Sequence, residues 1–263
     1  MSFVIDDLFE VKQKAYRKLI NEKYDDILML STKVNTLALT ILSKLNVKTD
    51  ETRKIILISF YHKIIESFQS TIILCTKGLY SDARSISRVL MEACFKLYAI
   101  NNDSDYYKYY IEQLKTDEIK QQKKLNEAKK YLTEAQQNSL EEYEIPMTSN
   151  KKKSNYHTKR IAKLAKLEGL YNTAYSDLCN SVHSNTSEII NKPKLIDKKI
   201  VLTTGNEYDF ELLIITNTAV LVDLMNKFNS DEALNFRSEI LEYQNKNENH
   251  REKFMRENDT LWQ

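Results

Sequence analysis

Glycine and proline are scarce in this chain of 263 residues, which has 3 Gly and 2 Pro. At average usage of about 7% and 5%, a chain of this length would hold roughly 18 and 13 of them. Tight turns and phosphate-cradling loops need residues that reach positive φ or pre-set φ. The shortage therefore argues against sandwiches, barrels, Rossmann sheets and P-loop folds, and predicts a chain of helices. The helix breakers are Gly78, Pro146, Gly169, Pro193 and Gly205.

Cysteine pairs and long apolar runs are also missing. Cys75, Cys94 and Cys179 lie far apart and form no CxxC, which is typical of reduced thiols in a cytoplasmic protein and argues against a cysteine-based zinc site. No stretch reaches the roughly 18 apolar residues of a membrane span, and the first residues do not resemble a signal peptide. His62 and Glu66, four residues apart, could be a metal-ligand pair, although a buried hydrogen-bonded pair is the favoured alternative, and no histidine has Glu-x-x-His or His-Glu-x-x-His spacing. We therefore expect no membrane association, no metal and no cofactor.

The spacing of apolar residues predicts the helices. Positions 1–46 have helical periodicity, with breaks expected near Asp6 and Asn21. Asp50 is a plausible N-cap for the next helix, which Gly78 should end, and Gly169 should stop a later, short basic helix. The other predicted helices span about 81–101, 104–144, 171–182, 209–228 and 231–257, and residues 200–204 resemble half of a small hairpin.

These elements predict an all-α fold, an up-and-down bundle of long helices with at most one small β-hairpin. We expect a single helical domain over residues 1–263, with its core at about 50–228. Residues 1–46 would form one or two N-terminal helices, and 229–263 a C-terminal helix.

A stripe of charges crosses an otherwise apolar helix. Arg84, Arg88, Glu92 and Lys96 recur every four residues and therefore share one face. Apolar residues flank this stripe, so we expect its middle members to be buried in the bundle or to line an internal cleft, and Arg88 and Glu92 are a candidate buried pair. Arg four residues before Glu is the weaker orientation for helix stabilisation, so local helix energetics do not explain the pair. Two readings stay open, an ion pair that fixes helix packing and a functional site.

A second polar segment surrounds His183. Tyr175 lies two turns before it on the predicted helix 171–182, and Ser184 follows it directly. His183 would sit at a helix end among hydroxyl and amide groups, where an imidazole can be oriented for acid–base work. A capping or packing histidine is the alternative.

A basic segment precedes this helix. Residues 151–166 contain seven basic side chains and no acidic one, with Tyr156 and His157 among them. A basic amphipathic helix here could contact phosphates, although a solvated charged helix is the common alternative. The candidate contacts are Lys152, Lys159, Arg160 and Lys163.

Two motifs carry a resemblance. The helix from Gly78 to Ala93 has the pattern Ala-Arg-x-x-x-Arg-x-x-x-Glu-Ala, and a later Tyr/Ser-rich helix ends in Val-His at His183. Together they resemble a widespread bacterial helical family of unknown function, over roughly residues 50–225.

More distantly, a helical bundle with a core of Arg, Glu and His is similar to HEPN-type domains, many of which are metal-independent ribonucleases of toxin and phage-defence systems. The resemblance implies that Arg88 stabilises the phosphorane charge, that Glu92 orients Arg88, and that His183 acts as general acid or base. In the usual HEPN motif, four to six residues separate Arg from His on one helix. Residues 176–178 here are Ser, Asp and Leu, so the site would be assembled from two helices.

The leading hypothesis is an HEPN-like RNA-binding protein, and with it a metal-independent ribonuclease effector of a toxin or phage-defence system. Its site would comprise Arg88, Glu92 and His183, with Arg84, Tyr175, Ser184 and the basic segment binding substrate. The alternative is a non-catalytic module that docks a partner protein or a second copy of the chain. A third reading is a small-ligand pocket formed by Arg84, Arg88 and the tyrosines at 106–110.

Overall fold

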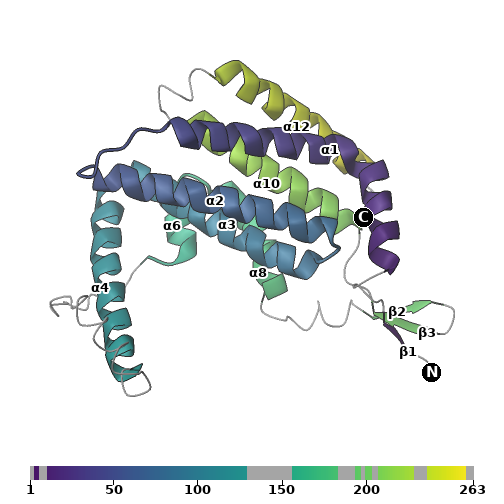
Figure 1. Ribbon diagram of the computed structural model, residues 1–263, viewed down its shortest axis with the longest axis horizontal. Helices are drawn as coiled ribbons and strands as arrows, with labels where there is room; N and C mark the ends of the chain where they lie inside the picture. Colours follow the sequence, from purple (N-terminus) through teal and green to yellow (C-terminus); the bar gives the residue numbers. More distant parts are fainter. Residues whose placement is uncertain are drawn as a thin grey trace.

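Helices make up most of the computed structural model, which describes residues 3–5, 11–128, 156–182, 193–196, 199–202, 207–227 and 236–258. The long helices are α1 (Val11–Lys44), α2 (Thr52–Thr76), α3 (Tyr80–Asn102), α4 (Ser104–Ala128), α10 (Glu207–Lys227) and α12 (Arg237–Glu257). The short ones are α6 (Thr158–Leu164), α7 (Glu168–Leu170), the π-helical turn η2 (Tyr171–Tyr175) and α8 (Ser176–Val182). The predicted all-α bundle is confirmed (Figure 1).

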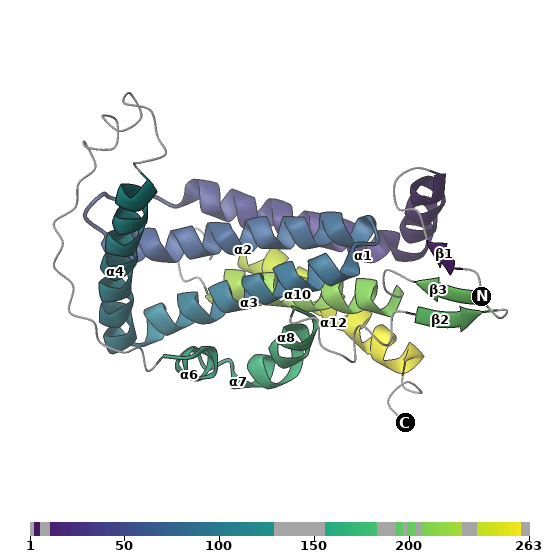
Figure 2. The same cartoon turned by 90° about the horizontal axis from the view of Figure 1, so that it is seen from below.

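The bundle is formed by α1, α2, α3 and α10, with α12 packed on α1 and α10 (Figure 1). Its core contains Val34, Phe68, Phe95, Phe210 and Leu221, none of which is more than slightly exposed. Burial of a side chain of this kind contributes about 1.5–3 kcal/mol. The short helices α6 and α8 pack on α3, and Figure 2 shows them as a separate layer below it.

Two helix interruptions lie close to their predicted positions. Tyr24 has non-helical φ −124° and ψ 17°, which kinks α1 near the break expected at Asn21. Gly78 has φ 74° directly after α2 and its C-cap residue. The N–H of Leu79 donates to Leu74 O (2.9 Å) and that of Gly78 to Cys75 O (3.0 Å), the bonds of a Schellman motif. Gly78 therefore ends α2 as predicted.

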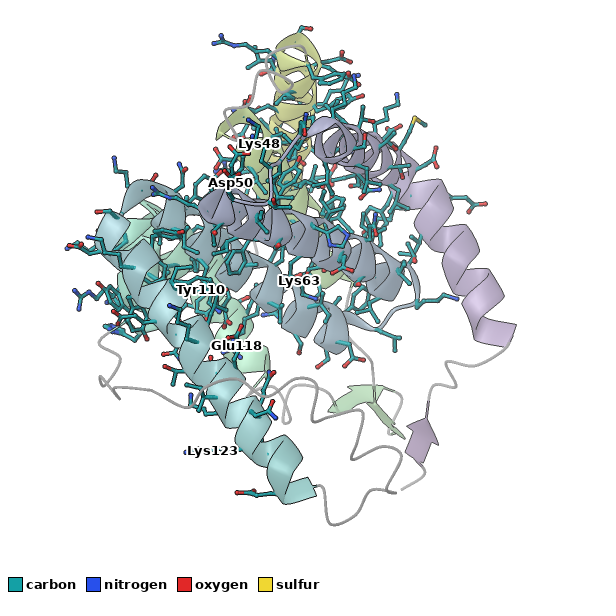
Figure 3. All side chains as sticks on the ribbon, turned by 60° about the vertical axis from the view of Figure 1, so that its left-hand side comes forward. Lys48, Asp50, Lys63, Tyr110, Glu118 and Lys123 are labelled. Atoms are coloured by element: carbon teal, nitrogen blue, oxygen red, sulfur yellow. The ribbon has the colours of Figure 1, made fainter. Side chains whose placement is uncertain are left out.

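Asp103 forms the corner between α3 and α4. It is extended (φ −130°, ψ 116°), and its Oδ1 accepts the N–H of Tyr106 at 2.7 Å. The predicted helix 104–144 thus begins where expected, directly after this cap. From this corner α4 runs away from the bundle (Figure 1) and lies across the ends of α2 and α3 (Figure 2). In Figure 3, Tyr110 lies near the bundle, whereas Glu118 and Lys123 lie further along α4.

The basic helix ends differently from the prediction. α6 ends at Leu164, and Lys166 takes the left-handed conformation (φ 59°) that glycine would usually supply. Here the N–H of Leu167 donates to Ala162 O at 2.9 Å. Gly169 lies inside α7 and stops nothing, so its predicted role is wrong.

A small sheet lies beside the bundle. β2 (Pro193–Ile196) and β3 (Lys199–Leu202) form the predicted antiparallel hairpin, with Leu195 opposite Ile200. β1 (Phe3–Ile5) pairs with β3 in parallel, which gives the order β1–β3–β2. β1 lies within residues 1–46, where only helices were predicted, because a strand of three residues leaves no periodic signal.

Among the helices of the described ranges, none has both the length and the apolar character to cross a membrane.

Candidate functional site

The predicted Arg88–Glu92 pair forms on the face of α3 that α6 and α8 cover. Arg88 Nη2 lies 3.2 Å from Glu92 Oε1, and the two side chains are 24% and 29% exposed. The pair is therefore not fully buried, and the other expected position, beside an internal cleft, fits Glu92, which lines a small cavity. Burial is incomplete because short helices, rather than a long one, cover this face of α3.

Tyr175 completes the cluster from a separate helix. Its hydroxyl donates to Glu92 Oε1 at 2.7 Å, and Arg88 Nε donates to the same hydroxyl oxygen at 3.4 Å. The Arg88 guanidinium carbon also lies 5.8 Å from the centre of the Tyr175 ring. Each of the three side chains thus contacts the other two, and we call them the Arg88–Glu92–Tyr175 cluster.

The position of Tyr175 depends on the π-helical turn η2. Tyr175 is its last residue, and its ring stacks on Tyr171 with centroids 5.2 Å apart. The ring also meets Phe95 of α3 edge-on at 5.5 Å. A π-turn widens the helix by one residue and occurs frequently at functional sites. In this chain it presents a buried aromatic hydroxyl to a charged pair on α3.

The surroundings of the cluster raise the pKa values of Tyr175 and Arg88, so both side chains keep their protons. Burial, above all, raises the pKa of Tyr175 above its ordinary value, so its hydroxyl remains a donor at neutral pH. The hydrogen bond with Tyr175 is the largest cause that raises the pKa of Arg88, and the Glu92 charge adds to it. Arg88 is therefore a permanent cation.

A small cavity of about 310 Å³ opens beside the cluster. Its polar wall residues are Glu92 and Lys96 of α3, and His157 and Thr158 at the start of α6. Phe95, Tyr156 and Ile161 supply the rest of the wall. The cavity thus joins a carboxylate, an ammonium and an imidazole in one space.

Sequence reasoning did not select His157 or Lys96 as site residues. Lys96 was noted in the charged stripe, and His157 only as a member of the basic segment. His157 is exposed and occupies the N-cap position of α6. Only the packing of α6 on α3 brings it to the same cavity as Glu92. No local spacing in the sequence signals that contact.

Arg84, predicted to bind substrate, is held by two carboxylates. Its Nη2 lies 2.6 Å from Asp177 Oδ2 on α8, and its Nη1 lies 3.0 Å from Asp209 Oδ1 on α10. The Arg84 side chain is only 14% exposed. These ion pairs join α3 to α8 and α10, which gives Arg84 a structural task.

The basic helix is amphipathic, as predicted. Lys159, Arg160 and Lys163 are exposed on α6, whereas Ile161 and Ala162 are buried. The Arg160 guanidinium lies 4.5 Å from the centre of the Tyr156 ring. Because α6 begins at the cavity wall, its exposed cations extend the charge of the site.

Three predicted site residues, Lys152, His183 and Ser184, lie outside the described residues. The meeting of Arg88 and His183 therefore stays a prediction.

The arginines and the tyrosines of the predicted small-ligand pocket have different partners. Tyr106 and Tyr109 pack with Tyr156, and Tyr110 with Phe60. Arg88, in contrast, contacts Tyr175 on η2. The structure thus places the two halves of that pocket in different surroundings.

Metal ligation has no candidate in the ranges that the structure describes, where no group of three or more His, Cys, Asp or Glu side chains could hold an ion.

Comparison with curated proteins and with solved structures gave no match. The model of DUF5677, a family of unknown function, matches residues 54–197, more than half of the chain. This range includes α3, α6 and η2, which build the cluster and the cavity beside it. The chain therefore belongs to the DUF5677 family.

Proposed function

We propose that the chain is an HEPN-like protein that binds single-stranded RNA at the cavity beside Glu92 and cleaves it without a metal ion. The observation that carries this proposal is the shared wall of Glu92, Lys96 and His157. A carboxylate, an imidazole and an ammonium together can supply the base, the acid and the charge stabilisation that RNA transesterification needs.

Each group has a distinct task in the proposed reaction. The Glu92 carboxylate takes the proton of a ribose 2′-hydroxyl, whose oxygen attacks the adjacent phosphorus. The protonated His157 imidazole gives its proton to the departing 5′-oxygen. Lys96 and Arg88 stabilise the negative charge that develops on the phosphorane. The products are a 2′,3′-cyclic phosphate and a 5′-hydroxyl.

The Arg88–Glu92–Tyr175 cluster supports this assignment. Arg88 and Tyr175 both contact Oε1 of Glu92. Within the described residues, no hydrogen bond or ion pair is formed by Oε2, which leaves that oxygen to accept a substrate proton. The two contacts also fix the orientation of the carboxylate, as a catalytic base requires.

The exposed cations of α6 supply the substrate contact. The formal net charge of the chain is only +2, so RNA affinity must come from local charge. Lys159, Arg160 and Lys163 lie on the helix that begins at the cavity. Each phosphate contact that they make should add to the salt dependence of binding.

The HEPN resemblance implies an acid–base role for His183, so the experiment tests His183 as well as His157. A purified sample in excess EDTA is incubated with a 5′-labelled single-stranded RNA. Glu92→Gln and His157→Ala should abolish cleavage, and cooperative thermal unfolding of each variant should show that it is folded. His183→Ala distinguishes the two histidines, since only the catalytic one is required.

Glu66→Gln and His62→Ala are matched controls, because both residues lie exposed on α2 and do not line the cavity. Both variants should cleave at the wild-type rate. Absence of cleavage by the wild-type chain, together with a stable complex with another protein, would favour the non-catalytic interaction module instead.

A further inference from the structure

A second and larger cavity lies between α3, η2 with α8, α10 and α12. Its volume is about 920 Å³, which is within the range of roughly 300–1,000 Å³ that small-molecule sites occupy. It has no wall residue in common with the cavity beside Glu92. The proposed ribonuclease activity makes no use of it.

Apolar side chains from four helical segments form most of its wall. They include Met91 and Cys94 on α3, Leu178 on α8, Leu213 and Val220 on α10, and Phe254 on α12. Such a wall favours a ligand with an apolar body, because binding removes apolar surface of both from water.

The charged residues of the wall have partners within the protein. Arg84 is paired with Asp177, and Arg251 with Glu248 at 3.1 Å. Asp223 Oδ2 accepts a hydrogen bond from the Tyr98 hydroxyl at 3.3 Å. A charged ligand would have to compete with these contacts, and the wall holds two cations and two anions. This arrangement favours an uncharged ligand.

One wall residue offers a polar anchor. The Asn217 side chain is buried, and its Nδ2 donates to Ser87 Oγ and to Leu213 O, both at 2.8 Å. Within the part of the chain that the structure describes, its Oδ1 has no hydrogen-bond partner. A buried acceptor in this state is unfavourable, so a ligand hydroxyl or N–H that comes within hydrogen-bonding distance of this atom would satisfy it.

We infer that this cavity binds an uncharged, mainly apolar small molecule with a hydrogen-bond donor at one end. Long-chain alcohols represent this chemistry. Ligands of the same chain length with a carboxylate bind less tightly, because their charge finds no free partner on the wall.

The test is a titration of the full chain with the neutral fluorescent probe N-phenyl-1-naphthylamine, followed by displacement with 1-dodecanol or dodecanoate. Saturable binding at one site per chain is expected. Dodecanol should displace the probe at a concentration roughly tenfold lower than dodecanoate. Absence of saturable binding, or stronger displacement by dodecanoate, overturns the inference.

Two variants locate the site. Ala219 on α10 and Thr173 on η2 line the cavity from exposed positions, so Ala219→Trp and Thr173→Trp fill it without rebuilding the core. Each should weaken probe binding by roughly tenfold or more. Met29→Trp is the control, since Met29 is an exposed apolar residue of α1 that does not line the cavity. Cooperative thermal unfolding of every variant confirms folding. Equal weakening by Met29→Trp contradicts the assignment.

Discussion

Tyr175 holds the charged pair of α3 in place from another helix. Along α3 alone, an Arg that precedes Glu by four residues gains little, so the geometry of Arg88 and Glu92 depends on the third partner. The Tyr175 hydroxyl supplies it by donating to Glu92 and accepting from Arg88. At the scale of residues, this hydroxyl links the fold to the proposed chemistry.

Replacing Tyr175 by Phe tests that link. Loss of the hydroxyl leaves the half-buried pair without its shared partner, so the free energy of unfolding should fall by about 1 kcal/mol. RNA cleavage should fall as well, because Glu92 loses its fixed orientation. Urea unfolding measures the first effect. Tyr171→Phe is the matched control, since Tyr171 stacks on the same ring without a described hydroxyl contact to the cluster. Equal effects of the two variants would show that the hydroxyl does nothing specific.

Two glycines in different conformations should respond oppositely to alanine. Gly78→Ala should lower the free energy of unfolding by about 1 kcal/mol, because a side chain is disfavoured at φ 74°. Gly169→Ala should raise it by about 0.4–1 kcal/mol, since nothing lies within 4 Å of an added Cβ and alanine restricts the unfolded chain. Urea unfolding of the pair checks both signs. A stabilised Gly78→Ala variant would refute the Schellman ending of α2.

At the scale of elements, the site depends on how α3 meets α8 and α10. Arg84 binds Asp177 and Asp209 at once, which fixes α8 directly after η2 and so holds Tyr175 against α3. Three elements distant in sequence are therefore joined by one guanidinium.

Removing that guanidinium should loosen this junction. Arg84→Met leaves Asp209, which is only 22% exposed, without its cation, so the free energy of unfolding should fall by about 1–3 kcal/mol. Lys108→Met is the control, since Lys108 and its partner Asp105 are both well exposed and such pairs contribute about 0–1 kcal/mol. Chemical denaturation compares them. Equal losses would mean that the Arg84 pairs contribute no more than a surface pair.

The contact of α10 with α1 and α12 should depend on pH through Glu211. Burial first, and then the charge of Glu257 on α12, raise the pKa of Glu211 above its ordinary value. The folded state therefore holds this proton more tightly than the unfolded state. The resulting stability is present below the ordinary carboxyl pKa and is lost as the pH rises through the raised one.

Glu211→Gln should accordingly stabilise the fold at neutral pH and lose its advantage below the ordinary carboxyl pKa. Thermal unfolding of both proteins across this pH range measures the difference. Glu51→Gln should act in the opposite direction, because a backbone hydrogen bond from Lys48 lowers the pKa of Glu51. A variant less stable than the wild type at neutral pH would contradict the sign for Glu211.

At the scale of the whole molecule, the helices and their order could be predicted, because the period of the apolar residues and the scarcity of glycine can both be read from the sequence without knowing how the chain packs. That Arg88 and Glu92 are neighbours was predictable from their four-residue spacing, which places them on one face of a helix, whereas their link to Tyr175 was not. The place of His157 was not, because it depends on α6 packing on α3. The end of α6 was not predicted, because Lys166, and not Gly169, takes the left-handed conformation that follows it. The single domain over residues 1–263 stays a prediction.

The most direct test of the proposed ribonuclease uses a DNA oligonucleotide with one ribose, incubated with the purified chain in EDTA. If Glu92 activates a 2′-hydroxyl, the strand is cut only after that ribose and ends in a 2′,3′-cyclic phosphate, and Glu92→Gln leaves it intact. An uncut strand, or equal cutting of the all-DNA strand, would contradict the account.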